Sequence, residues 1–291
     1  MTLLGSYVQP RETRRVWSGG LVSLLTELGF SDGAARIALT RLVRRDLLAR
    51  HREGRLVHYS LTKRTVAVLA DGDRRIFGLG RRAGPAGTWT VLWQSIPETR
   101  RQARETLVRR LRFLGFGPVQ DGTWLAPHDR EAEVLALLDE LGVTEHAGLM
   151  LGTPSTALDV RRFAGRAWDL DELSARYDAF VSEFGGSPRD LPDAEAFVVR
   201  TRLVHEFRVF PTLDPELPGE LIPAPGRRAA AVELFHDRYA ALAPAAQRHF
   251  DRTVRTTDFD RAQSHRTESH RTELHRAESH RTESHRTEPT G

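Results

Sequence analysis

The sequence predicts an α+β protein built from three folded segments and a disordered tail. Three observations support this class. The first 82 residues show helical apolar spacing followed by strand-like alternation, residues 88–160 follow the order β-α-β-β-α-β, and residues 165–260 are mainly helical in pattern. We therefore expect domains at 1–82, 88–160 and 165–260, and a tail at 261–291.

Two helices joined by a short turn are predicted near the N-terminus. Residues 17–28 carry leucines at helical spacing, and Gly29 follows where glycine commonly ends a helix. Ser31 is a suitable cap for a second helix over residues 31–47. The expected rear of that helix is Ala35, Ala38, Leu39 and Leu42, and the expected front is Arg36, Thr40 and Arg44. An apolar rear and an arginine-bearing front are typical of a helix-turn-helix DNA-binding domain.

A basic β-hairpin is predicted directly after these helices. Residues 47–62 alternate in character on both sides of Glu53-Gly54, which indicates two strands and a tight turn. A basic hairpin behind a recognition helix is a wing, so the segment is predicted to be a winged helix-turn-helix domain. Residues 1–82 hold 16 Lys/Arg against 7 Asp/Glu, a net +9 in a chain of net +4. The alternative is a solvated basic surface without a partner.

The expected partner is therefore double-stranded DNA, and its contacts divide by chemistry. Base edges are reached by the leading end of the recognition helix, where Arg36 is the best candidate to bind a guanine. Basic residues farther along the helix and on the wing are expected to bind phosphates. The predicted DNA-binding residues are Ser31, Gly33, Arg36, Thr40, Arg41, Arg44, Arg52 and Arg55.

The middle segment is predicted to be ferredoxin-like, with two helices on one face of an antiparallel sheet. Residues 81–87, RRAGPAG, precede it as a linker. Small CRISPR-associated nucleases with this fold place a metal-binding aspartate at the end of the first strand, where this chain has Ser95. Serine is a poor ligand for a hard divalent cation. The segment is therefore interpreted as a spacer or dimerisation element, with a metal-dependent nuclease as the alternative function.

The C-terminal segment offers aromatic and basic residues on predicted helices, one starting at Asp169 and another spanning 193–210 until Pro211 stops it. These side chains are candidates to line a pocket for an anionic aromatic effector. They are Trp168, Tyr177, Arg200, Arg202, His205 and Arg208. In the alternative, the aromatic residues belong to the core and the arginines pair with nearby acids.

Composition and motifs exclude several other classes. The chain has no cysteine, no apolar run of membrane-spanning length and no secretory leader, so it is expected to be soluble and cytoplasmic. It carries no P-loop and no G-x-S-x-G motif, so no enzymatic activity, cofactor or metal is expected. Residues 264–288 repeat SHRTE-like units five times, and this near absence of apolar side chains predicts disorder.

Four passages, in order, closely resemble the PaaX-like regulators, a family named for the repressor of the phenylacetic acid degradation operon. The resemblance extends from about Leu3 to about Arg255. It is carried by ARIALTRLVRRDLLARHREGRLVHYSLT, by TVLWQSIPETRR with LRFLGFGPVQDGTWLAP, by WDLDELSARYDAF, and by RTRLVHEFRVFPTLDPELPGELIP. The stretch ARIALTRL also looks like the recognition helices of GntR-type repressors, in which an arginine at the place of Arg36 contacts DNA.

The resemblance implies a homodimeric repressor of an aromatic catabolic operon that binds a pseudo-palindromic operator. It also implies release by a small molecule, with an acyl-CoA thioester as the best-known inducer of the family. Such a ligand is anionic and bulky, which suits arginines beside aromatic side chains. The SHRTE repeats depart from the family pattern.

Overall fold

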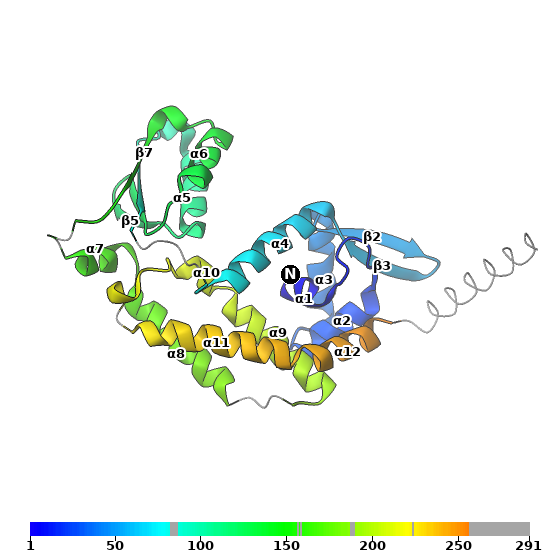
Figure 1. Ribbon diagram of the computed structural model, residues 1–291. Coiled ribbons are helices and arrows are strands. Elements are labelled where there is room, and N and C mark those ends of the chain that lie inside the picture. Colours follow the sequence, from blue (N-terminus) through cyan, green and yellow to red (C-terminus); the bar gives the residue numbers. More distant parts are fainter. Residues whose placement is uncertain (82–86, 156, 158, 187–189, 223, 256–291) are drawn as a thin grey trace, which may run out of the picture. The chain divides into compact units, whose positions relative to one another are not determined.

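The computed structural model describes residues 1–81, 87–155, 157, 159–186, 190–222 and 224–255 (Figure 1). The chain is a mixed helix-and-sheet protein with two antiparallel sheets. The predicted tail at 261–291 and most of the predicted linker at 81–87 lie outside the described residues. Among the described residues, no helix has both the length and the apolar character needed to cross a membrane.

The chain forms two compact units whose boundaries differ from the predicted ones. Unit 1 consists of Met1–Ser6 and Ala67–Ala246, and unit 2 consists of Tyr7–Val66 and, of the described residues, 247–255. Each unit is therefore built from two segments that are far apart in the sequence. Each unit is described by itself below.

Unit 2 holds the two predicted helices and the predicted hairpin, together with a strand that was not expected. Its elements are β1 (Val16–Trp17), α2 (Ser18–Glu27), α3 (Asp32–Arg44), β2 (Leu48–Glu53), β3 (Leu56–Leu61) and most of α12 (Ala243–Val254). The sheet order is β1-β3-β2, and all pairs are antiparallel. The two predicted helices and the predicted hairpin thus follow one another along the chain.

Local signals set the ends of these elements. Gly29 has a φ of +91°, a conformation that favours glycine, directly after α2. The Ser31 hydroxyl accepts the backbone N–H of Ala34 at 3.3 Å and so caps α3. Gly54, with a φ of +61°, forms the hairpin turn with Arg55. Short-range chemistry was therefore enough to predict these boundaries.

The buried face of α3 is narrower than predicted. Ala35 and Leu39 are buried and Leu42 is half-buried, but Ala38 is exposed, so its assignment to the rear of the helix was wrong. Unit 2 covers α3 only along this stripe, and the rest of the helix faces solvent.

Helix α12 completes the core of unit 2 from the far end of the sequence (Figure 1). The Phe250 ring stacks on Tyr7 with centroids 5.3 Å apart, and the Arg14 guanidinium contacts Asp251 at 2.5 Å. Gly20 of α2 allows the close approach, because a Cβ there would lie 2.5 Å from the Thr253 carbonyl oxygen. This part of α12 was predicted to belong to the C-terminal domain at 165–260 and instead packs with residues 7–66.

The central sheet lies in unit 1 and has the predicted order of elements. These are β4 (Trp89–Gln94), α5 (Arg101–Phe113), β5 (Gly117–Gln120), β6 (Thr123–Ala126), α6 (Glu131–Glu140) and β7 (Ala147–Gly152). The strand order is β5-β6-β4-β7, with every neighbouring pair antiparallel. Leu92 of β4, Leu107 of α5 and Val134 of α6 belong to one buried cluster, so both helices cover the same sheet face.

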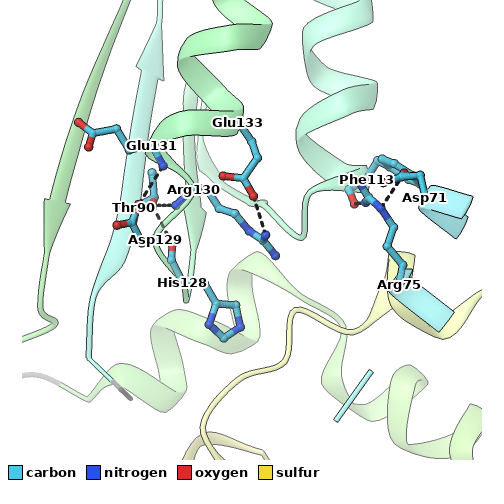
Figure 2. Close-up of polar contacts among 9 residues, drawn as sticks. All are labelled: Asp71, Arg75, Thr90, Phe113, His128, Asp129, Arg130, Glu131 and Glu133. Atoms are coloured by element: carbon cyan, nitrogen blue, oxygen red, sulfur yellow. Dashed lines mark hydrogen bonds and ion pairs between the residues drawn. The ribbon is translucent and has the colours of Figure 1, made fainter. Parts of the chain in front are cut away.

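Buried polar contacts hold the loop before α6 on the sheet (Figure 2). The Thr90 hydroxyl donates to the His128 carbonyl at 2.7 Å and accepts the Arg130 N–H at 2.9 Å. At the end of α5, the Arg75 guanidinium lies 3.7 Å from the ring centroid of Phe113 and donates to its carbonyl oxygen at 2.9 Å. The contact between Arg75 and Phe113 ties the sheet and its helices to the preceding part of unit 1.

The remaining elements are helical. They are α1 (Thr2–Tyr7), α4 (Lys63–Gly78), α7 (Val160–Ala167), α8 (Leu170–Gly185), α9 (Asp193–Phe207), α10 (Phe210–Leu213) and α11 (Pro225–Ala241). The helix predicted to start at Asp169 is α8, and Asp169 caps it by accepting the Glu172 N–H at 2.9 Å. Pro211 does not stop the preceding helix: α9 ends at Phe207, and Pro211 lies in the first turn of α10, where its missing N–H costs nothing.

Candidate nucleic-acid interface

One face of α3 is exposed along its whole length and carries most of the predicted contacts. Its members occupy positions i, i+3, i+4, i+7, i+8 and i+11, so they share one side of the helix. They are Gly33, Arg36, Ile37, Thr40, Arg41 and Arg44, and all of them are exposed. We call this set the α3 face. An α-helix with such a side fits the major groove of DNA.

An acidic partner holds Arg36 in a defined orientation. The Nε of Arg36 donates to one Asp32 carboxylate oxygen at 2.6 Å, and Nη2 donates to the other at 3.2 Å. This hydrogen bond and the opposite charge raise the pKa of Arg36, and the pKa of Asp32 is lowered by the same hydrogen bond. The carboxylate occupies one edge of the guanidinium, so the Nη1 edge remains to donate to a guanine.

Ile37 is the member of the α3 face that sequence reasoning missed. Ile37 is 54% exposed and lies between Arg36 and Thr40 on this face. An isolated exposed isoleucine is not unusual, but this one lies on the arginine-bearing side of the helix. Apolar contact with a thymine methyl group is a standard means of base recognition. An apolar residue outside the buried stripe of α3 was the signal available in the sequence.

Gly33 and Thr40 contribute shape more than charge. A Cβ at Gly33 would meet no atom within 4 Å, so the fold itself does not require glycine there. Its absence of a side chain leaves the tip of α3 open to close approach. The Thr40 hydroxyl donates to the Arg36 carbonyl at 2.9 Å, which leaves its oxygen lone pairs available as acceptors.

The β2–β3 hairpin carries a second set of exposed basic side chains. Arg52 lies near the end of β2 and Arg55 lies in the turn, and the Nε of Arg52 donates to the Gly54 carbonyl at 3.2 Å. Arg15 pairs with Glu53 at 2.7 Å and so links the chain before β1 to the hairpin tip. The Arg15–Glu53 pair therefore holds the hairpin tip, while the guanidinium groups of Arg52 and Arg55 face solvent, as phosphate contacts require.

Comparison with known proteins shows which family the chain belongs to. The chain is 30% identical over 245 residues to the "Transcriptional repressor PaaX" of Escherichia coli (strain K12), covering 79% of this chain and 75% of that protein. The chain belongs to the PaaX-like family. Residues 1–65 match the PaaX-like protein family, residues 82–163 the PaaX protein central Cas2-like domain, and residues 168–252 the PaaX-like protein C-terminal domain.

A solved structure has a similar fold. The uncharacterized protein Rv0674 from Mycobacterium tuberculosis matches with a TM-score of 0.56 and 23% sequence identity, over 86% of this chain and 96% of that chain. This likeness concerns the fold alone. Together the comparisons make this PaaX-like chain a mixed helix-and-sheet protein with a Cas2-like central domain.

The six predicted effector residues of this PaaX-like chain lie in unlike environments. Tyr177 is buried, donates to Asp214 at 2.7 Å and stacks on Phe210. Arg200 is also buried, donates to the Tyr239 carbonyl at 3.1 Å and lies over the Tyr239 ring. Tyr177 therefore lies in the core, as the alternative interpretation of the sequence has it, and Arg200 is buried against Tyr239.

The other four predicted effector residues do not join them. Arg202 is exposed and pairs with Glu183 at 2.5 Å. His205 and Arg208 are exposed on the same stretch of chain, and Trp168 is half-buried with its Nε1 donating to the Gly115 carbonyl. Because buried Arg200 and exposed Arg202 lie on different faces of α9, the structure does not bring the six residues together.

Ser95 lies at the position considered for a nuclease metal ligand. Its backbone N–H donates to the His146 carbonyl at 2.8 Å, and the neighbouring Gln94 side chain accepts the Ile96 N–H. Within the described ranges, no group of three or more His, Cys, Asp or Glu side chains is arranged to hold a metal ion.

A buried histidine gives unit 2 a dependence on pH. His58 of β3 lies opposite His51 and Trp17 and is 3% exposed. Burial is the main cause of its pKa falling below the ordinary 6.5. The unfolded chain therefore binds a proton more readily than the folded unit, so stability is complete above about pH 6.5 and declines as the pH falls.

We expect the thermal midpoint of the protein to be lower at about pH 5 than at about pH 7.5, and the difference to shrink in His58→Gln. Glutamine cannot take up a proton, so it removes this contribution. Thermal unfolding followed by circular dichroism across this range measures both proteins. An equal pH dependence in the two would show that His58 is not responsible.

Proposed function

We propose that this chain is a DNA-binding transcription repressor, as the name of its Escherichia coli relative states for that protein. The α3 face carries the proposal: three arginines and an isoleucine share one exposed side of a capped helix, beside a basic hairpin. The two features together supply base recognition and phosphate attraction.

Unit 2 is proposed to act as a winged helix-turn-helix. The α3 helix enters the major groove, where Ser31, Gly33 and Arg36 at its leading end reach base edges. Along the helix, Thr40 offers an acceptor, and Arg41 and Arg44 bind phosphates. Arg52 and Arg55 bind backbone phosphates from the wing. The support is the order α2–α3–hairpin and the exposure of these side chains.

The central sheet is proposed to be a ferredoxin-like domain at 88–160 that acts as spacer or dimerisation element. Its strand order β5-β6-β4-β7, with both helices packed on one face, supports this arrangement. The proposed DNA-binding domain at 1–82 and helical domain at 165–260 contain the other elements, except that α7 begins before residue 165. The return of α12 to unit 2 extends the DNA-binding part beyond residue 82.

The repressor is proposed to bind a pseudo-palindromic operator as a homodimer. One recognition helix covers a half-site of a few base pairs, and a two-fold dimer places a second α3 one helical turn of DNA away. An acyl-CoA or other aromatic metabolite is proposed to release it. Such a ligand must bind the DNA-free conformation more tightly, and its coupling to DNA is reciprocal.

No observation favours the nuclease alternative. The Gln94 side chain is engaged with the Ile96 N–H, and Ser95 replaces the aspartate that such a site needs. We therefore propose a non-enzymatic regulator without a metal or cofactor.

Transcription in vitro from the region upstream of the chain's own gene tests the repressor function. Added protein is expected to reduce the transcript from this template and leave a control promoter unaffected. An unchanged or increased transcript would contradict repression.

The wing arginines are expected to set salt dependence. Arg52→Ala or Arg55→Ala should each weaken binding of operator and random DNA to a similar degree and lower the slope of log K against log salt by about one unit. Titrations at several salt concentrations measure this slope. Arg202→Ala, which breaks an exposed pair with Glu183 in unit 1, is the matched control. A slope unaltered by either wing variant would argue against phosphate contact.

A further inference from the structure

The two faces of the central sheet are covered differently. Helices α5 and α6 bury one face in a continuous apolar cluster. On the other face, a smaller cluster joins Trp89 of β4 and Leu125 of β6 to Ala164 of α7. Beside this cluster, between the sheet and α7, lies a cavity of about 600 Å³. This volume falls in the range of about 300–1,000 Å³ that is typical of small-molecule sites.

Most of the cavity lining is apolar. Trp89 and Leu125 are buried at its base, and Val91, Met150 and Phe163 also line it. Met150 is 58% exposed and Phe163 is 38% exposed. Adjacent large apolar side chains left open to water commonly mark a binding site. A ligand with an apolar body would remove these side chains from water.

The polar part of the lining is mainly basic. Arg162 and Arg166 lie one turn apart on α7 and both line the cavity. Neither forms an ion pair with any residue that the structure describes. Asp159 also lines the cavity, but its carboxylate caps α7 by accepting the N–H groups of Arg161 and Arg162 at 3.0 and 3.4 Å. Two guanidinium groups therefore remain available to an anion.

We propose that this cavity binds an organic anion with a bulky aromatic or acyl body. Arg162 and Arg166 bind the carboxylate or phosphate oxygens, because a guanidinium fork matches their geometry. Trp89, Met150 and Phe163 cover the apolar body. That the ligand acts as the effector of the repressor rests on the proposed function, whereas its binding to the cavity does not.

Isothermal titration of the full chain tests the site. The probes are phenylacetyl-CoA and octanoyl-CoA, with phenylacetate, octanoate and CoA alone to separate thioester from free-acid ligands. We expect at least one acylated or aromatic probe to bind once per chain. Arg162→Ala combined with Arg166→Ala should weaken this binding at least tenfold, and Arg161→Ala, next to Arg162 but outside the lining, should leave it unchanged.

A second variant fills the cavity without removing charge. Gly152 lines it, and a Cβ there would meet no atom within 4 Å, so Gly152→Leu places a side chain in open space. This variant should abolish binding while its thermal midpoint stays near that of the wild type. Gly165→Leu on α7, also with open space around its Cβ but outside the lining, is the control.

The outcomes separate this proposal from the proposed function. Absence of binding by every probe, or wild-type affinity in both the double variant and Gly152→Leu, would overturn the cavity assignment and leave the repressor standing. Light scattering gives the oligomeric state of the wild type and of Gly152→Leu. If the wild type is a dimer and Gly152→Leu is a monomer that still binds the ligand, the cavity assignment is overturned and this region is an interface between copies of the chain. Ligand binding lost in the variants supports the cavity even if the chain fails to bind DNA.

Discussion

Arg36→Ala is expected to remove a large part of the preference for operator over random DNA. Each bidentate arginine–guanine contact contributes about 1–3 kcal/mol of discrimination, and a homodimer loses two of them. The free protein already holds the guanidinium against Asp32, so the contact needs little reorganisation. Competition titrations with operator and random duplexes at about 0.15 M salt measure the ratio of the affinity for operator to the affinity for random DNA. We expect it to fall by a factor on the order of 100.

Asp32→Asn keeps Arg36 but weakens the contact that orients its guanidinium, so it tests whether this orientation contributes to operator preference. The asparagine removes a negative charge beside the DNA, so affinity for random DNA should rise. It also weakens the hold on the guanidinium, so the operator preference should fall.

Equal loss of operator and random binding in Arg36→Ala would assign Arg36 to phosphate contact instead. Arg227→Ala, which breaks an exposed pair with Asp178 in unit 1, is the matched control.

Asp214→Ala is expected to lower the free energy of unfolding more than either Tyr177→Phe or Glu183→Ala. The Asp214 side chain is fully buried and accepts the Tyr177 hydroxyl at 2.7 Å, the Arg228 guanidinium at 2.7 and 3.0 Å, and the Glu216 N–H at 2.6 Å. Removing it leaves Arg228 largely buried without its counter-charge. Breaking a buried pair in this way typically costs about 3–5 kcal/mol.

Thermal and urea unfolding measure this loss, which should lower the thermal midpoint by roughly 10 °C for a unit of this size. Tyr177→Phe removes only one hydrogen bond to the same carboxylate and should cost about 1–2 kcal/mol. Glu183→Ala breaks an exposed ion pair and should cost less than about 1 kcal/mol. A loss in Asp214→Ala no larger than in Glu183→Ala would show that the buried cluster does not stabilise the fold.

Local signals in the sequence predicted most of the candidate interface. Gly29 ends α2, Ser31 caps α3, and Gly54 turns the hairpin through interactions that span a few residues. Spacing alone then placed Arg36 and Arg44 on one side of the helix. Ile37 was missed because the front of the helix was assigned from its arginines and threonine alone, and the exposed Ile37 lies outside the narrow buried stripe of α3.

Interactions between distant residues could not be predicted in the same way. The Tyr7–Phe250 stack joins the two ends of the described chain, and no local pattern indicates it. Tyr177 and Arg200 have the composition of a ligand site, but their partners Asp214 and Tyr239 approach only in the folded chain. Their roles depend on tertiary packing, which is why the predicted effector pocket did not form from these residues.

Footprinting on the DNA upstream of the chain's own gene tests the central claim most directly. The purified protein and its Arg36→Ala variant are compared at about 0.15 M salt with excess random competitor. The account predicts a protected pseudo-palindrome with half-sites about one helical turn apart, lost in the variant. Salt-sensitive binding without a protected site, or a footprint that Arg36→Ala leaves intact, would contradict recognition by the α3 face.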